Sequence, residues 1–413
     1  MAYIPPHKRH SKDINTPQPT PSLFIPPSPS HHHRNSKQSF KPSINGGKIL
    51  YCRDSIHRWF VIPSNDDHQD TQFHPCSVRL KEFPHEFLER RNGAKPFILV
   101  SDHPQQQEVN ENAESFIKSP WLSIEEKIKH DLLTCFQNAR NEMCKDVEEL
   151  NVPRFVIRFG KILFHSGRFV NLDNVNKPSS VESLLSRMKT QYYTNVPDSF
   201  VRDVLSEFGP KSGFDFFGEK DCYEVKVFDK SRPESTISCK CSLNDTSGEL
   251  DVYKVELDEV RQMVVDISCL DKNLDLRLLT ASKRILNSLT DEEKHSLSSL
   301  VKSAVKDTEA KGGLRWPLGN ESFGDRYTVV GVWHTRGKTL KSSSVWLKVR
   351  EADRFDFTTS TGGVSKEISL RIPKVNKHLK DETLVELDPL VDMVSDTLKL
   401  VWNNFLCWEG SFV

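Results

Sequence analysis

An acidic residue and a Glu-x-Lys pair follow one another in the middle of the sequence. Asp215 comes after a helical pattern, and Glu224 and Lys226 lie in the segment 222–228, which alternates like a β-strand. Side chains two residues apart point to the same face of a strand. With Asp215 close by, two carboxylates could hold Mg²⁺ while the lysine orients a water molecule, as in a metal-dependent nuclease. A cross-strand ion pair on an exposed sheet face is the alternative.

A second group of residues combines aromatic rings with positive charges. On the predicted strand 344–351, Trp346, Lys348 and Arg350 share one face. Bases stack on aromatic rings while basic side chains contact phosphates, so such a face can bind single-stranded RNA. The alternative is that the tryptophans are half-buried packing residues. The candidate RNA-binding residues are Trp333, Arg336, Lys338, Lys341, Trp346, Lys348 and Arg350.

Two further motifs lack the spacing that their chemistry needs. The segment 331–339 has the glycines and the Lys-Thr pair of a phosphate loop. However, five residues separate the glycines where the motif has four, and a strand pattern follows in place of a helix. A hairpin turn is the better interpretation. Cys239 and Cys241 lie on a predicted strand without the second pair that a zinc site needs, so we expect no metal and no cofactor.

Hydrophobic periodicity predicts the elements that must position these residues. One helix begins at Ser123, which forms a capping-box pattern with Glu126, and another begins with Asp388 as N-cap and Pro389 at the first helical position. Strands come in runs instead of alternating singly with helices, which predicts an α+β protein with mostly antiparallel sheets and several helices. The predicted strands are 48–52, 56–62, 77–83, 96–100, 154–159, 222–228, 235–241, 250–257, 262–268, 274–280, 326–334, 344–351 and 365–372, and the predicted helices are 123–147, 181–189, 198–207, 291–308 and 388–405.

Composition divides the 413 residues into a tail and a folded body. Residues 1–46 carry six Lys and Arg against one acidic residue and hold nine of the 23 prolines, so we expect a disordered, basic, Pro/Ser-rich tail. The body is long enough for two modest cores, and we expect two lobes, 47–178 and 179–413. We expect no membrane contact, because no apolar run approaches the roughly 20 residues of a spanning helix. The nine scattered cysteines are typical of reduced thiols in the cytoplasm or nucleus.

The opening peptide has the features of a linear docking motif for a protein partner. Its tyrosine and isoleucine supply two anchors, and its prolines restrict the free chain, which reduces the entropy lost on binding. Its lysine and arginine would steer the peptide toward an acidic surface. A solvated leader without a partner is the alternative. The residues of this motif are Tyr3, Ile4, Pro5, Pro6, Lys8 and Arg9.

The most distinctive segments are the opening M-A-Y-I-P-P-H-K-R-H and the stretches FGKILFH (159–165), TISCKC (236–241), KGGLRWPL (311–318) and VVGVWH (329–334). Together they resemble a land-plant family of uncharacterised proteins that share a domain of unknown function. The resemblance covers nearly the whole chain and implies neither an activity nor site residues. Residues 3–9 also resemble the Y-I-P-P-H-L-R peptide of a subfamily of DEAD-box RNA helicases, which implies a link to messenger RNA. In place of the leucine in that peptide, this sequence has Lys8.

We therefore expect an intracellular, non-enzymatic interaction or RNA-associated factor whose tail docks onto a protein. The alternative is a metal-dependent, nuclease-like enzyme that uses Asp215, Glu224 and Lys226. The two hypotheses differ in whether these three side chains converge in one cluster of a size that fits a metal ion.

Overall fold

The computed structural model describes residues 49–62, 78–84, 95–101, 119–143, 149–165, 185, 188–244, 248–270, 272–381 and 386–412. The predicted tail, its docking motif and most of the predicted helix 181–189 lie outside these residues. In the part of the chain that is described, no helix has both the length and the apolar character needed to cross a membrane.

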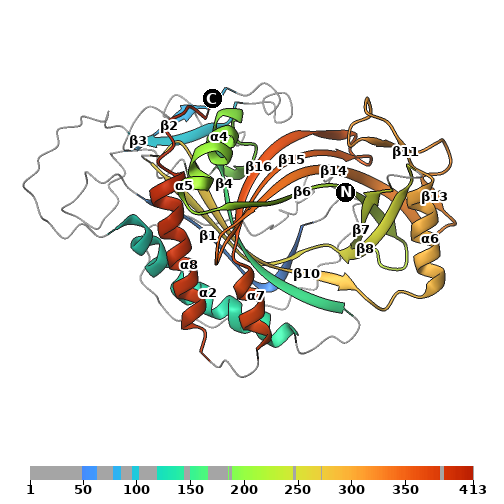
Figure 1. Ribbon diagram of the computed structural model, residues 1–413, viewed down its shortest axis with the longest axis horizontal. Coiled ribbons are helices and arrows are strands. Elements are labelled where there is room, and N and C mark those ends of the chain that lie inside the picture. The colour runs from blue at the N-terminus through green and yellow to red at the C-terminus, as the bar shows by residue number, and fades with distance from the viewer. Residues whose placement is uncertain are drawn as a thin grey trace, which may run out of the picture.

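Within the described residues, eight antiparallel strands close into a barrel. In order around the ring they are β4 (Glu149–His165), β10 (Asp275–Leu286), β8 (Leu250–Leu257), β7 (Thr236–Leu243), β6 (Asp215–Asp229), β14 (Tyr327–Lys341), β15 (Trp346–Asp356) and β16 (Thr361–Arg371). The ring closes because β16 also pairs with β4, where Ser369 lies opposite Arg158. Between β10 and β8, the described residues form one registered pair, Ile285 with Glu256. Figure 1 shows β6, β14, β15 and β16 arching over β10.

The sheet continues beyond the barrel on both sides of the β4–β10 pair. β9 (Val260–Cys269) pairs with β10, and β1 (Leu50–Ile62) pairs with β9 in parallel. At the other end of β4, pairing extends to β5 (Lys189–Tyr193) and β3 (Phe97–Ser101), and then to β2 (Val78–Glu82). Three short strands, β11 (Val305–Lys306), β12 (Leu314–Arg315) and β13 (Ser322–Phe323), lie near the start of β14.

The barrel wall follows from alternation along its strands, and β4 is the clearest case. Phe155, Ile157 and Phe159 are fully buried on the outer face. Arg154 and Arg158, which alternate with them, line the interior. An amphipathic strand therefore has its apolar face on the outside of this barrel, under the helices, and its charged face on the inside.

Helices cover two parts of the outer face. The larger core lies between β4, β15 and β16 on one side and α2 (Pro120–Met143), α7 (Pro373–Lys380) and α8 (Asp388–Leu400) on the other, as Figure 1 shows. From α2, Ile128, Leu132 and Phe136 are fully buried there. The smaller core lies under α6 (Asp291–Lys302), against β6, β7 and β8. Further helical segments are α4 (Asp198–Asp203), α5 (Gly209–Lys211) and the π-helical η4 (Val204–Phe208) and η5 (Val401–Phe405).

The predicted α+β class is confirmed, and in the described residues all registered strand pairs except β1 with β9 are antiparallel. The predicted strands 48–52 and 56–62 form one strand, β1, with an irregularity between Tyr51 and Ile56. The main sheet is continuous across the lobe boundary predicted near residue 178, because β4 pairs with both β10 and β16.

Several predicted boundaries are wrong. α2 begins at Pro120 instead of Ser123, since a proline suits the first turn of a helix. α6 ends at Lys302 and not at 308. Leu387, not Asp388, is the N-cap of α8, and α7 is absent from the predicted elements. Propensity places helix ends only to within one or two residues.

The interpretation of 331–339 as a hairpin turn is also wrong, because this segment lies inside β14. The turn between β14 and β15 is four residues long, and in it the Ser342 amide donates to the Val345 carbonyl at 2.9 Å. Gly337 is a strand residue whose lack of a side chain has a packing reason. A Cβ atom at that position would lie 2.9 Å from Cγ of Arg350 on the neighbouring strand.

Candidate anion-binding site

The inner face of the barrel carries charged side chains from all parts of the ring. They surround a cavity of about 410 Å³. The basic lining residues are Arg154, Arg158, Lys226, Lys240, Arg261, Lys283, Arg350 and Arg354, and the acidic ones are Glu224, Glu256, Asp258, Glu259 and Glu367. Among these described residues the basic side chains outnumber the acidic ones by eight to five, so the interior has an excess of positive charge.

Ion pairs occupy most of the acidic side chains in this interior. The pairs are Glu224 with Lys226 (2.5 Å) and Lys240, Glu256 with Lys254 (2.7 Å) and Lys283 (2.9 Å), Glu259 with Arg154, and Glu367 with Arg354 (2.8 Å). By contrast, the guanidinium groups of Arg158 and Arg350 have no hydrogen bond or salt bridge within the described residues, and the Nε atom of each is buried. The negative charge of Glu367 acts on both arginines, but neither is bonded to it, so their N–H donors are available to an anion.

The lysines of the interior are less basic than lysines in water. Burial lowers the pKa of Lys240 to about 7, and the positive charges of Lys283 and Arg154 add to the effect. Burial also lowers the pKa of Lys226, Lys283 and Lys348 to about 8. Removal from water destabilises the charged form of each amine, and neighbouring cations add repulsion at Lys240, Lys283 and Lys348, which a bound anion would relieve.

Tryptophan and glycine residues of β14 shape the site around these cations. Lys226 Nζ lies 4.1 Å from the centre of the Trp333 ring, and the Arg354 guanidinium lies 5.2 Å from it. The face of the ring is a favourable environment for a cation that has lost water. Gly337, opposite Arg350, leaves the space through which the Arg350 side chain extends into the cavity.

The structure divides the seven predicted RNA-binding residues between two faces. Trp333, Lys341, Trp346, Lys348 and Arg350 lie on the inner face of β14 and β15. Arg336 and Lys338 lie on the outer face, in a pocket of about 530 Å³ beside α4 and η4.

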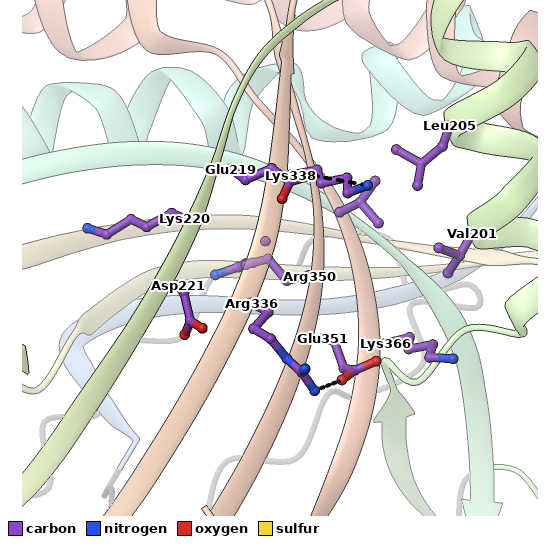
Figure 2. A pocket seen from close by; sticks show the side chains of 12 residues that line it. Val201, Leu205, Glu219, Lys220, Asp221, Arg336, Lys338, Arg350, Glu351 and Lys366 are labelled. Carbon is purple, nitrogen blue, oxygen red and sulfur yellow. Dashed lines mark hydrogen bonds and ion pairs between the residues drawn. The ribbon is translucent and has the colours of Figure 1, made fainter. Parts of the chain in front are cut away.

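In the outer pocket, acidic neighbours neutralise the cations. Arg336 pairs with Glu351 at 2.6 Å, and Lys338 pairs with Glu219 at 3.1 Å. Figure 2 shows the Lys338 side chain extending toward α4 and that of Arg350 extending the other way. The single RNA-binding face expected from the sequence is therefore two faces, and on the outer one Arg336 and Lys338 are each paired with an acidic side chain.

The three residues of the nuclease hypothesis do not come together. Glu224 and Lys226 lie side by side on the inner face of β6, with 2.5 Å between Glu224 Oε1 and Lys226 Nζ. Asp215 is exposed at the start of the same strand. Glu224 lies nine positions further along the strand, which corresponds to about 30 Å. In the described part of the chain, no three Asp, Glu, His or Cys side chains form a group that could hold a metal ion.

Most of the charged lining is not evident from the sequence. Arg154 and Arg158, Lys240, and Glu256 all alternate with apolar residues on predicted strands, a pattern that usually indicates a solvent-facing sheet. The feature of the sequence that could have revealed this lining is that charged residues alternate with apolar residues on many consecutive strands. A closed barrel is one way to place all these faces together. Cys239 and Cys241, by comparison, are buried in the outer core.

Comparison with known proteins gives one family and some low similarities. The model of a family described as a domain of unknown function, DUF7903, matches residues 43–405. No curated protein matches the sequence. Among solved structures, the Schizosaccharomyces pombe RNA triphosphatase Pct1, in complex with the Spt5 CTD, has 11% sequence identity and a TM-score of 0.39, over 70% of this chain and 96% of that one. The mimivirus capping enzyme triphosphatase has 6% identity and a TM-score of 0.26, over 66% and 95%. A putative adenylate cyclase from Bacillus halodurans has 11% identity and a TM-score of 0.21, over 50% and 87%.

Proposed function

The chain belongs to the DUF7903 family of domains of unknown function, and we propose that the barrel of this protein binds a phosphorylated ligand whose negative charges enter the interior. The description of the family assigns no activity, so the ligand is inferred from the charges in the barrel interior. It names a chemical class of ligand, an anion with several negative charges.

One observation carries this proposal: the interior holds more cations than its own acids can neutralise. A buried charge without a partner costs several kcal/mol, so the chain maintains this arrangement at the expense of stability. Arg158 and Arg350, which have no bonded partner among the described residues, present planar guanidinium groups. Such groups bind phosphate oxygens through paired hydrogen bonds.

Single-stranded RNA, expected from the sequence, is one member of this ligand class, because its phosphates are anionic. Binding without catalysis is the simpler function for the geometry, since Asp215 lies about 30 Å along β6 from Glu224. Glu224 and Lys226 nevertheless lie in the interior, where a phosphoryl group would bind. Release of phosphate from the ligand is therefore the second candidate function.

Titration calorimetry with inorganic tripolyphosphate at low ionic strength tests the proposal. Replacement of Arg350 by Gln should weaken binding about tenfold or more, because a hydrogen bond to a charged group contributes about 1.5–3 kcal/mol. Arg336→Gln is the matched control: it removes the same group from the opposite face and should leave the affinity unchanged. Equal losses in both variants, or no binding to the wild type, would reject the interior as the site. Phosphate release on addition of Mg²⁺ would favour the catalytic alternative.

The opening peptide supports a second proposal, from sequence alone. Tyr3 and Ile4 would anchor it to a protein partner in the cytoplasm or nucleus, with Lys8 and Arg9 as steering charges. A pull-down should lose one defined partner when residues 1–12 are removed. The free peptide should compete for this partner and its Tyr3→Ala version should not. Identical partners for both proteins would reject the motif.

A further inference from the structure

Aromatic and basic side chains gather at the end of the barrel where β14 turns into β15. Lys341 Nζ lies 2.9 Å from the centre of the Phe217 ring and 4.4 Å from that of the Trp346 ring. Lys348 Nζ lies 5.8 Å from the centre of the Trp346 ring. We call these four residues, Phe217, Lys341, Trp346 and Lys348, the mouth cluster.

Part of this cluster is held open to solvent by an irregularity in β6. Gly218 pairs with Thr339 and Phe216 pairs with Leu340, so Phe217 between them has no partner on β14. A bulge of this kind redirects a side chain, and the Phe217 side chain is 64% exposed. Exposure of a large aromatic side chain to water is unfavourable, and exposed apolar surface of this kind often marks a binding site.

A second pair of side chains repeats the combination of ring and cation. Tyr253, which interrupts the pairing of β8 with β7, is 48% exposed. Lys220 lies 4.4 Å from the centre of its ring and donates to its hydroxyl at 2.5 Å. Lys220 follows Gly218 on the inner face of β6.

The mouth cluster is continuous with the anion-binding interior. Trp346, Lys348 and Arg350 succeed one another on the inner face of β15, at intervals of about 7 Å. Burial lowers the pKa of Lys348, and the charges of Arg350 and Arg371 lower it further, so this lysine belongs electrostatically to the interior. A ligand that stacked on the Trp346 ring would direct the groups attached to it toward Lys348 and then Arg350.

We propose that the ligand is a nucleotide unit that carries 5′-phosphoryl groups: its base stacks at the mouth cluster and its phosphates reach Lys348 and Arg350. This inference rests on the proposed function. Every base has a flat π face, so stacking on Trp346 and Phe217 requires no particular sequence. A free nucleoside triphosphate and the 5′-triphosphate end of single-stranded RNA share this chemistry.

Titration calorimetry with three groups of ligands tests the inference. They are inorganic tripolyphosphate, ATP, and a short single-stranded RNA with either a 5′-triphosphate or a 5′-hydroxyl. The wild type should bind ATP or the triphosphorylated RNA about tenfold more tightly than tripolyphosphate, because stacking on an aromatic ring adds affinity. Tighter binding of the RNA than of ATP identifies a strand end, and the reverse identifies a free nucleotide.

Variants of the mouth separate this inference from the proposed function. Trp346→Ala combined with Phe217→Ala should abolish the preference for base-bearing ligands, so that ATP, triphosphorylated RNA and tripolyphosphate bind with similar affinity. Phe217→Ala alone provides a variant that should fold even where Trp346→Ala does not, because its ring is mostly exposed. Phe323→Ala, which removes another exposed ring from β13, is the matched control.

Three results would overturn the inference. They are equal affinity for ATP, triphosphorylated RNA and tripolyphosphate, an unchanged preference in Phe217→Ala and the double variant, and binding of the 5′-hydroxyl RNA as tight as that of ATP or of the triphosphorylated RNA. In each case the proposed function still stands if the protein binds tripolyphosphate and this binding is weakened by Arg350→Gln. A folded wild type that binds none of the ligands would reject both.

Discussion

Two arginines of neighbouring strands show how the face of a strand determines the role of a residue. Arg336 points outward and pairs with Glu351, whereas Arg350 points inward and has no bonded partner in the described residues. Their registered positions on β14 and β15 differ by one residue. From sequence both are basic residues near a tryptophan, so only the strand register separates them.

Removal of an unpaired cation should stabilise the free protein. Arg158→Met keeps an unbranched, apolar side chain and removes a buried charge, and we expect the free energy of unfolding to rise by about 1 kcal/mol without ligand. Urea denaturation in phosphate-free buffer measures this change. Arg336→Met, at an exposed salt bridge, should lower it by at most about 1 kcal/mol. A loss of stability in Arg158→Met would mean that the guanidinium supports the fold and is not reserved for a ligand.

The lowered pKa values of the interior lysines predict how stability depends on pH. Folded Lys240 loses its proton near pH 7, whereas a lysine in the unfolded chain keeps its proton to about pH 10. In that window the unfolded state binds more protons, so the free energy of unfolding should rise with pH. The charged groups that face Lys240 are Glu224 from β6, Glu256 from β8, Lys283 from β10 and Arg154 from β4.

Tripolyphosphate should favour the protonated lysines, so its stabilising effect should be largest below about pH 7 and decrease toward about pH 9. Urea denaturation across this range, with and without the ligand, measures both trends. Lys240→Met should weaken the pH dependence, and Lys338→Met on the outer face should not. A constant effect of the ligand from about pH 6 to about pH 9 would contradict an interior site that contains Lys240.

At the scale of elements, α6 depends on its first turn. The Thr290 hydroxyl accepts from the Glu293 amide at 3.2 Å, and the Glu293 carboxylate accepts from the Thr290 amide at 3.0 Å. Glu293 also binds Arg326, which forms a paired salt bridge with Asp229 at the end of β6. The same carboxylate therefore caps the helix and attaches it to the barrel.

Loss of this cap should destabilise the smaller core. We expect Thr290→Ala to lower the free energy of unfolding by about 1 kcal/mol, because an amide at the helix start loses its acceptor. Thr290→Ser keeps the hydroxyl and should lie within a few tenths of the wild type. Urea denaturation compares the three proteins. Equal stability of the alanine and serine variants would show that Arg326 alone positions α6.

Local patterns predicted most elements of this fold but not how they assemble. Alternation of Phe155, Ile157 and Phe159 with arginines indicates a strand, and β4 is one. The same pattern does not reveal that the charged face is enclosed, because enclosure requires β16 to return to β4. The prediction of a hairpin turn between Gly331 and Gly337 is wrong for a related reason. Glycine occurs both in turns and at positions where neighbouring strands pack closely.

At the scale of the whole molecule, the candidate site exists only because the ring is closed. Its cations come from β4, β6, β7, β9, β10 and β15, which are distant in sequence. The sequence singles out Glu224, Lys226, Trp333 and Arg350 individually and favours different hypotheses for them. Long-range pairing brings them into one cavity, and no single-segment pattern contains that information.

A ligand that binds these strands together should hold the ring closed. The weakest junction in the described barrel is that between β8 and β10, where Ile285 with Glu256 is the one registered pair and Lys283 bridges to Glu256 at 2.9 Å. We expect tripolyphosphate to slow amide hydrogen exchange in 250–257 and 281–286. Exchange in α2, outside the barrel, serves as the internal reference. Equal slowing in all three segments would indicate general stabilisation instead.

The closing of the ring by β16 also has a consequence for biosynthesis. β4 leaves the ribosome early, whereas its partners β10 and β16 lie at 275–286 and 361–371. Throughout that interval of translation, the part of β4 up to Gly160 lacks its final neighbours, and unpaired edges promote aggregation. Contacts between such distant segments also form slowly. The ring can therefore close only after residue 371 has been made, so its folding comes late relative to synthesis of the chain.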